Sequence, residues 1–139
     1  MIAVGTDILE IERMEKSLKN PRFLTRVFSH AEIEWLREKN FPAQSAAGNY
    51  CAKEAFSKAL GTGVRGFSLS EVSVLRDECG KPYRLLEGRA REKAAGRSFS
   101  VSISHCRRYA TAVVDVYKRQ HSRCPATHRG SAAGTRPRR

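Results

Sequence analysis

The chain has 139 residues and a formal net charge of +12, with 26 Lys or Arg against 14 Asp or Glu. This length allows one domain with a hydrophobic core of its own. Seven of the basic residues and no acidic ones fall in residues 117–139, so residues 1–116 carry 19 basic against 14 acidic side chains, or +5. A body of this moderate charge suits an acidic protein or a polyphosphate, and we expect no nucleic-acid partner.

The cysteines and the N-terminus indicate the compartment. The four cysteines are widely spaced and form no C-x-x-C pair, which argues against a redox motif or a zinc ribbon and favours a reducing environment. Acidic residues follow the N-terminus at once, unlike the start of a secretion signal. No apolar run approaches the length of a membrane span. We therefore expect a cytoplasmic protein that does not bind a membrane.

The first predicted elements are a strand and a helix. Residues 1–6 form a short apolar run typical of a strand, and Asp7 ends this run. Ile11, Met14 and Leu18 then recur at helical spacing, and an Asn-Pro dipeptide breaks the helix.

Three further helical segments are predicted before residue 61. Apolar residues over 23–28 indicate a short helix. Ser29 and Glu32 have the spacing of a capping box and predict that another helix begins there. Residues 43–60 keep helical spacing over the longest stretch, and Gly61 stands where a C-terminal cap belongs.

The second half of the chain changes to the alternation typical of strands. A turn of acidic and glycine residues joins two of these strands into a predicted hairpin, and a short polar helix precedes the two final strands. The predicted ranges are 72–74 and 82–86 for the hairpin, 87–95 for the helix, and 99–103 and 109–116 for the last two strands.

This order of elements indicates an α+β fold. Helices come first and antiparallel strands later, so we expect a single domain over residues 1–116 in which the N-terminal helices pack on an antiparallel sheet. Residues 117–139 lack apolar periodicity and are predicted to form a disordered basic tail. His121, Cys124 and His128 in this tail resemble a loose metal-ligand set, but three ligands without a fourth favour incidental placement.

The candidate chemistry centres on the long predicted helix. Glu54 and Lys58 lie one turn apart and share a face. Such a pair by itself is more often a solvent-facing ion pair, and Asp7 by itself could be a helix N-cap. Gly61 and Gly63 follow and permit close backbone approach. Two carboxylates suffice for a hard divalent cation when substrate phosphates supply the other ligands, so we predict a metal site at Asp7 and Glu54.

Four ordered segments resemble holo-acyl-carrier-protein synthase, the short bacterial 4'-phosphopantetheinyl transferase. They are Gly5-Thr6-Asp7-Ile8, the run from Lys53-Glu54-Ala55 to Gly61-Thr62-Gly63, Gly80-Lys81-Pro82, and Ser102-Ile103-Ser104-His105. The resemblance spans residue 1 to about residue 116. It implies the transferase-like fold and a role in fatty acid biosynthesis, in which coenzyme A donates its phosphopantetheine arm to a serine of apo acyl carrier protein and leaves adenosine 3',5'-bisphosphate.

The resemblance also implies roles for single residues. Asp7 and Glu54 would hold Mg²⁺, Lys58 would neutralise a phosphate oxygen, and Glu54 or a water on the metal would be the base for the incoming serine. The implied coenzyme-binding residues are Ser57, Lys58, Gly61 and Gly63 toward the phosphates, Lys81 and Pro82 beside the adenine, and His105 at the adenosine phosphate end.

The resemblance further implies a homotrimer with each site shared between neighbouring subunits. Arg13, Arg22 and Arg26 would form a basic landing surface for the acidic carrier protein, unless they are simply a solvated face. Asn49 departs from the family pattern, because many relatives carry a basic residue there, and this puts a phosphate contact at that position in doubt.

Two other classes of function compete with the enzyme. One is a basic module that binds RNA or DNA through the tail, with the body as a scaffold. The other is a coenzyme A sensor that binds its ligand without transferring any group.

Overall fold

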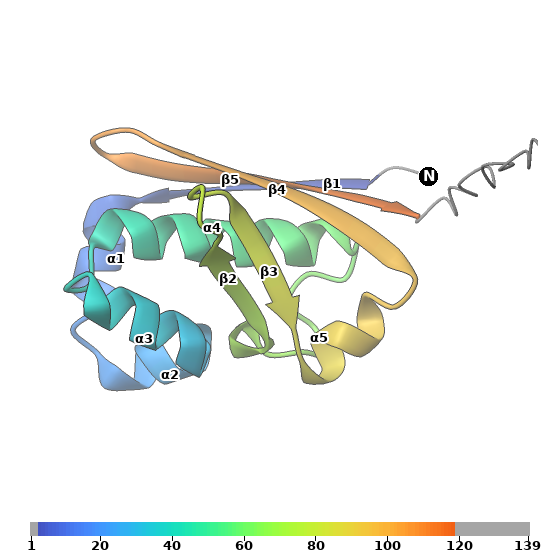
Figure 1. Cartoon of the computed structure of the whole chain (residues 1–139), viewed down its shortest axis with the longest axis horizontal. Helices are drawn as coiled ribbons and strands as arrows, with labels where there is room; N and C mark the ends of the chain where they lie inside the picture. The colour runs from blue at the N-terminus through green and yellow to red at the C-terminus, as the bar shows by residue number, and fades with distance from the viewer. Residues whose placement is uncertain (1–2, 119–139) are drawn as a thin grey trace, which may run out of the picture.

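The structure is a computed structural model that describes residues 3–118. Its centre is a three-stranded antiparallel sheet covered on one face by a long helix (Figure 1). The strands are β1 (Ala3–Glu10), β5 (Tyr109–Lys118) and β4 (Arg97–His105), with β5 in the middle. The helix is α4 (Ala43–Ala59), which packs against β1 and β5. The first and last strands of the chain are therefore neighbours.

The other elements surround α4. Three short helices gather near its N-terminal end, and a separate two-stranded hairpin crosses beside the sheet (Figure 1). Their bounds are Ile11–Ser17 for α1, Pro21–Val27 for α2, His30–Glu38 for α3, Leu69–Glu71 for the 3-10 turn η1, Val72–Arg76 for β2, Pro82–Leu86 for β3 and Gly88–Lys93 for α5. Within residues 3–118, no helix has the length and apolar character needed to cross a membrane.

Local sequence signals set several element ends, as predicted. The Ser29 hydroxyl accepts from the Glu32 amide, and the Glu32 carboxylate accepts from the Ser29 amide, so the capping box of α3 is complete. The Asn20 side chain caps α2. Gly61 takes a φ of 79° just after α4, a backbone conformation that favours glycine.

The α+β prediction is confirmed, but several details were wrong. The first strand continues through Asp7 to Glu10, because β5 pairs with it along its whole length and Asp7 faces Ala112 across the ladder. Asp7 is therefore not a helix N-cap. The last strand reaches Lys118, two residues beyond the predicted domain end, because its ladder with β4 continues to Arg97. The predictions for the rest of the tail, including His121, Cys124 and His128, lie outside the described residues.

The main cover of the sheet is α4, and not the early helices. Eleven of its 17 residues are buried, and many of them are alanine or glycine, which lets neighbouring backbones come close. Gly5 on β1 shows how close: a Cβ at this position would collide with the backbone oxygen of Ala55 and would lie 2.7 Å from the amide nitrogen of Ala59. Contact between β1 and α4 at Gly5 therefore requires glycine.

We expect Gly5→Ala to destabilise the fold by more than about 3 kcal/mol, because the added methyl group meets rigid backbone that cannot move aside. Urea denaturation followed by circular dichroism would measure the loss. Glu38→Ala at the end of α3 is the control, since this exposed side chain lies away from the contact between β1 and α4 and its loss should be nearly neutral. Equal stability of the two variants would contradict this view of the contact.

Candidate active site

Asp7 faces the long helix. Along β1, Gly5 and Asp7 point toward α4, whereas Val4 and Ile8 point to solvent. The Asp7 side chain is only 17% exposed, and its Oδ1 lies 3.3 Å from the Lys58 Nζ. The same ammonium group donates to the Thr6 carbonyl oxygen at 2.9 Å. Lys58 thus joins α4 to β1 instead of forming only a local helix pair.

Glu54 lies near the same point, one turn before Lys58. Burial raises the pKa of Glu54, and the charge of Asp7 raises it further, while a hydrogen bond from Tyr50 and the charge of Lys58 act in the opposite direction. The pKa of the nearby Cys51 thiol is also raised, to about 12, first by burial and then by the negative charge of Asp7. The charge of Asp7 therefore acts on both Cys51 and Glu54, so the two carboxylates share one electrostatic environment.

This donor set fits a hard divalent cation. Two carboxylates with a single lysine beside them leave an excess of negative charge, and carboxylate oxygens are the ligands that Mg²⁺ prefers. Within residues 3–118, no cluster of three or more His, Cys, Asp or Glu side chains could hold a metal. Asp7 and Glu54 would therefore supply two ligands at most, and the oxygens of a bound phosphate or of water would supply the others.

The residues predicted to meet the phosphates differ in what they offer. Ser57 is fully buried, and its hydroxyl donates to the Glu54 carbonyl oxygen at 2.7 Å, so its predicted contact with a phosphate stays a prediction. Gly61 and Gly63 lie in the loop after α4 with φ angles of 79° and 59° and open space around them. Their backbone is accessible from solvent.

A second group of predicted residues lines a cavity of about 280 Å³ beside β4. Pro82 and His105 meet there, although 22 residues separate them in sequence. Lys81 is exposed next to Pro82 but does not line the cavity. The complete lining is Trp35, Lys39, Gln44, Ser45, Gly48, Arg76, Gly80, Pro82, Ile103 and His105.

These two groups lie on opposite edges of the sheet. Asp7 belongs to the edge strand β1 and His105 to the other edge strand β4, with β5 between them and α4 beneath. The cavity contacts α4 at Gln44 and Gly48, near its N-terminal end, whereas Gly61 follows its C-terminal end. A helix of this length spans about 25 Å. We call the group at β1 and the group at β4 the two half-sites.

The structure also shows a buried polar network that the sequence did not predict. Lys53, next to Glu54, is fully buried and forms an ion pair with Glu32. Its ammonium group also donates to the carbonyl oxygens of Val27 at 2.7 Å and Leu69 at 3.1 Å. Burial lowers the pKa of Lys53, and Glu32 opposes that shift. The spacing of the capping box was visible in the sequence, but the partner of Glu32 was not.

Asn49 belongs to this network too. It is fully buried, and its side-chain amide donates to the Glu32 Oε2 at 3.1 Å and to the Val74 carbonyl oxygen at 2.9 Å. Its own oxygen accepts from the Arg76 Nη2 at 3.0 Å. Asn49 is therefore held inside the fold by three hydrogen bonds.

The three predicted docking arginines are all exposed. Arg22 and Arg26 are four residues apart on α2 and share a face, while Arg13 lies on α1. Helix α2 lies close to the carboxylate pair, because its Phe23 ring stacks on Tyr50 with centroids 6.4 Å apart. Burial and then the negative charges of Glu54 and Asp7 raise the pKa of Tyr50, so Tyr50 lies in the electrostatic environment of the two carboxylates.

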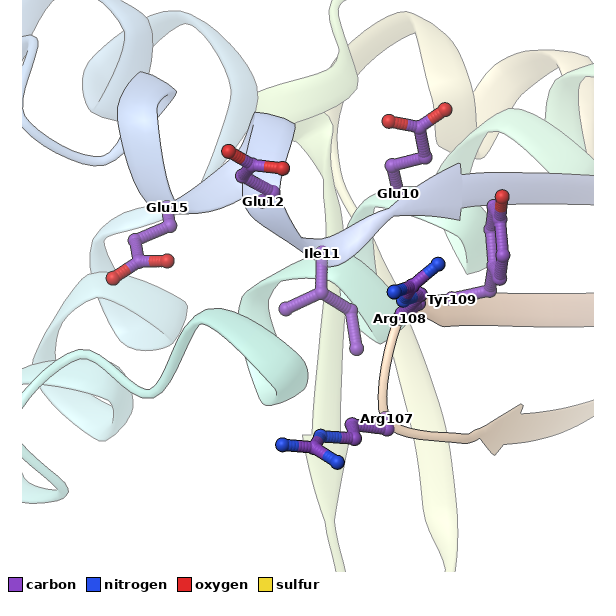
Figure 2. A pocket seen from close by; sticks show the side chains of 7 residues that line it. All are labelled: Glu10, Ile11, Glu12, Glu15, Arg107, Arg108 and Tyr109. Carbon is purple, nitrogen blue, oxygen red and sulfur yellow. The ribbon is translucent and has the colours of Figure 1, made fainter.

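Another hollow, of about 470 Å³, opens where β1 runs into α1, and the turn between β4 and β5 forms its other wall. Figure 2 shows three carboxylates and two guanidinium groups around it. None of the predicted site residues lines this hollow. Its lining is Glu10, Ile11, Glu12, Glu15, Arg107, Arg108 and Tyr109. The acidic residues on α1 make that helix less basic than α2.

Comparison with known proteins decides the family. A family model described as the 4'-phosphopantetheinyl transferase superfamily matches residues 3–114. The chain belongs to this superfamily. It is 47% identical over 116 residues to holo-[acyl-carrier-protein] synthase from Caldanaerobacter subterraneus subsp. tengcongensis, covering 81% of this chain and 91% of the relative. It is 40% identical to the protein of the same name from Fusobacterium nucleatum, covering 81% and 96%.

Solved structures of superfamily members share the fold. The holo-[acyl-carrier-protein] synthase of Neisseria meningitidis aligns with a TM-score of 0.78 at 30% identity, covering 85% of this chain and all of that one. The Helicobacter pylori enzyme, solved in complex with coenzyme A, aligns with a TM-score of 0.72 at 34% identity, covering 82% and 99%. The predicted family and fold are confirmed.

Proposed function

We propose that the chain is an enzyme that transfers the 4'-phosphopantetheine group of coenzyme A to a serine of apo acyl carrier protein, in fatty acid biosynthesis in the cytoplasm. The single observation that carries this proposal is the ion pair of Asp7 on β1 with Lys58 on α4, with Glu54 one turn before Lys58 on the same helix. Relatives of matching length are named for this activity, and the Helicobacter pylori structure holds coenzyme A.

The chain's own residues suit each part of the transfer. The serine oxygen attacks the phosphorus that carries the pantetheine arm, the anhydride bond breaks, and adenosine 3',5'-bisphosphate leaves with the bonding electrons. Glu54, directly or through a water, accepts the serine proton, and its raised pKa makes it a stronger base. Lys58 neutralises a phosphate oxygen. Mg²⁺ held by Asp7 and Glu54 would polarise the diphosphate and offset charge on the leaving group.

The decisive experiment mixes the chain with apo acyl carrier protein, coenzyme A and Mg²⁺ and follows the carrier by mass spectrometry. We expect the carrier to gain the mass of one phosphopantetheine group. A chain lacking residues 119–139 separates the competing functions: it should keep the transfer activity, whereas salt-sensitive retention of RNA or DNA should disappear with the tail if that segment binds nucleic acid. Coenzyme A binding without any transfer would instead indicate a sensor.

We further propose that the active unit is a homotrimer whose sites form between neighbouring subunits. Two observations support this proposal. The half-sites of one chain lie on the two edge strands of the sheet, β1 and β4, so each half-site is open to a neighbouring copy at its own edge. The sheet face away from α4 also exposes apolar side chains, and no described element covers it (Figure 1). These side chains are Val4, Ile8, Tyr109, Val113 and Tyr117.

A complementation experiment tests the shared site. Asp7→Ala and His105→Ala each damage a different half-site, so each homotrimer should be inactive or weak. Co-expression should restore activity, because about one quarter of the sites in randomly mixed rings combine an intact Asp7 with an intact His105 from a neighbour. Activity in the mixed sample no greater than the mean of the two variants would contradict sharing, and light scattering would report the oligomeric state directly.

We propose that α2 is the docking element for the carrier protein, with Arg22 and Arg26 facing it and Arg13 at the edge. Phe23 and Tyr50 connect α2 to Glu54, so a carrier bound there would present its serine near the carboxylates. The glutamates of α1 would repel an acidic carrier on the other side.

Arg22→Glu is expected to raise the KM for carrier protein roughly tenfold and to weaken its salt dependence, because a favourable charge becomes repulsive. The KM for coenzyme A should remain unchanged. Steady-state kinetics at two salt concentrations would measure both. Arg89→Glu is the matched control, since this exposed arginine lies on α5, away from α2 (Figure 1). A normal carrier KM for Arg22→Glu would reject this docking surface.

A further inference from the structure

The cavity beside β4 holds two cations on one aromatic ring. The Arg76 guanidinium lies 5.2 Å from the centre of the Trp35 ring, and the Lys39 ammonium lies 5.5 Å from it. Arg76 comes from the end of β2, whereas Lys39 follows α3 and is exposed. Cation–π contact with tryptophan favours both positions. The Trp35 ring therefore holds two positive charges beside the same cavity.

A hydrogen bond to Asn49 also holds the Arg76 side chain in place. Its Nη2 donates to the Asn49 Oδ1 at 3.0 Å, and Asn49 is anchored to Glu32 and to the backbone of β2. Both Asn49 and Glu32 are fully buried. The guanidinium is thus pre-positioned by a rigid chain of hydrogen bonds, so an incoming ligand would not need to order this side chain.

Arg76 has no carboxylate partner among the described residues. None of the residues that line the cavity is acidic. Within residues 3–118, no carboxylate lies at ion-pair distance from Arg76, which is half-buried. Burial lowers the pKa of Arg76, and the more distant charge of Glu32 opposes this shift. The Arg76 Nη1 donates to the Leu75 carbonyl oxygen at 3.3 Å and its Nη2 donates to Asn49, so these two bonds use only part of its five N–H donors. A half-buried, immobilised guanidinium that lines a cavity is suited to bind an anion.

We propose that Arg76 binds the 3'-phosphate of the coenzyme and that Asn49 is its positioning residue. This inference rests on the proposed function and on the resemblance, which implies that the adenosine end of coenzyme A lies beside Pro82 and His105. A phosphate monoester is close to a dianion at neutral pH, and an arginine fork matches its oxygens. The arrangement also gives Asn49 a role: β2 provides the cation, and α4 provides the amide that orients it.

The experiment compares ligands that differ only in the 3'-phosphate. Coenzyme A is paired with dephospho-coenzyme A, and adenosine 3',5'-bisphosphate with 5'-AMP. Trp35 is the only tryptophan of the chain, so its fluorescence reports binding at this cavity. Arg76→Gln should weaken binding of both 3'-phosphorylated ligands roughly tenfold to a hundredfold and leave the other two nearly unchanged. Isothermal titration would confirm the constants without the fluorescent probe.

Arg37→Gln is the matched control. Arg37 lies on the same helix as Trp35 and pairs with Glu34 outside the cavity, so its loss removes the same charge without changing the preference for the 3'-phosphate. Asn49→Ala should also lower the preference for the 3'-phosphorylated ligands. The double variant Asn49→Ala/Arg76→Gln should lose no more of this preference than Arg76→Gln alone, because Asn49 acts through Arg76. A merely structural role of Asn49 would not change the ratio between paired ligands.

The possible outcomes separate this inference from the proposed function. If Arg76→Gln keeps the wild-type ratio between paired ligands, or if the wild type shows no preference, the inference is overturned even when transfer to carrier protein occurs. If the wild type prefers the 3'-phosphate through Arg76 but transfers nothing, the inference holds and the proposed function fails. If Asn49→Ala does not fold, Arg76→Gln and Arg76→Lys still test the inference. Arg76→Lys should keep part of the preference for the 3'-phosphate that Arg76→Gln loses.

Discussion

Asp7→Ala and Glu54→Ala are each expected to reduce phosphopantetheine transfer by about 10³-fold or more, because each removes one of two carboxylates that would hold Mg²⁺ at the diphosphate. Metal stabilisation of charge in a transition state is worth several kcal/mol, and each 1.36 kcal/mol corresponds to a factor of ten in rate. Both side chains lie in a polar site between β1 and α4, so the fold should survive the substitutions.

The measurement is the rate of carrier modification over a range of Mg²⁺ concentrations. Wild-type activity should disappear with a chelator and return with Mg²⁺, while neither variant should recover at any metal concentration. Glu12→Ala is the matched control, because that carboxylate is on α1, is three-quarters exposed and pairs only with Lys16. Wild-type turnover in either Asp7→Ala or Glu54→Ala would refute the metal site.

A metal-binding readout separate from catalysis should agree. In the presence of coenzyme A, Mg²⁺ should raise the melting temperature of the wild type, since a ligand that binds only the folded state stabilises it. The same addition should leave the melting temperature of Asp7→Asn and Glu54→Gln unchanged. These amide variants keep the side-chain shape and remove the charge.

Glu32→Gln is expected to lower the free energy of unfolding by about 3 to 5 kcal/mol, because it leaves the Lys53 ammonium buried without its carboxylate. Glutamine can still complete the capping box of α3, so the loss would report mainly the broken ion pair. Lys53→Met should cost a similar amount by leaving Glu32 buried and unpaired. The double variant should lose less than the sum, as expected for side chains in direct contact.

Urea unfolding at several pH values would test this pair. Burial lowers the pKa of Lys53 in the folded state, so in Glu32→Gln the unfolded chain binds more protons over the interval between the two pKa values. Stability of that variant should therefore rise with pH through this interval. Glu34→Gln is the control, since its pair with Arg37 on the same helix is about half exposed and should be worth under 1 kcal/mol. A similar small loss for Glu32→Gln would contradict the buried pair.

The local patterns of the sequence were enough to predict most of the helices and strands. Helical spacing and the capping box located α3 and α4, because these signals depend only on neighbouring residues. The resemblance carried by four short segments indicated Asp7 and Glu54 together, and the structure brings them into one environment. It could not indicate that Ser57 is turned inward toward the Glu54 carbonyl.

Long-range contacts decided the partners of the buried polar side chains and the extent of the first strand. Lys53 looks like part of a charged motif, yet it is buried against Glu32, which lies 21 residues earlier. Asn49 looks like a lost phosphate contact, but in the fold it orients Arg76. The strand β1 passes through Asp7 because β5, more than 100 residues later, pairs with it. Pairing and burial of this kind join residues distant in the chain, and only the tertiary structure fixes which ones meet.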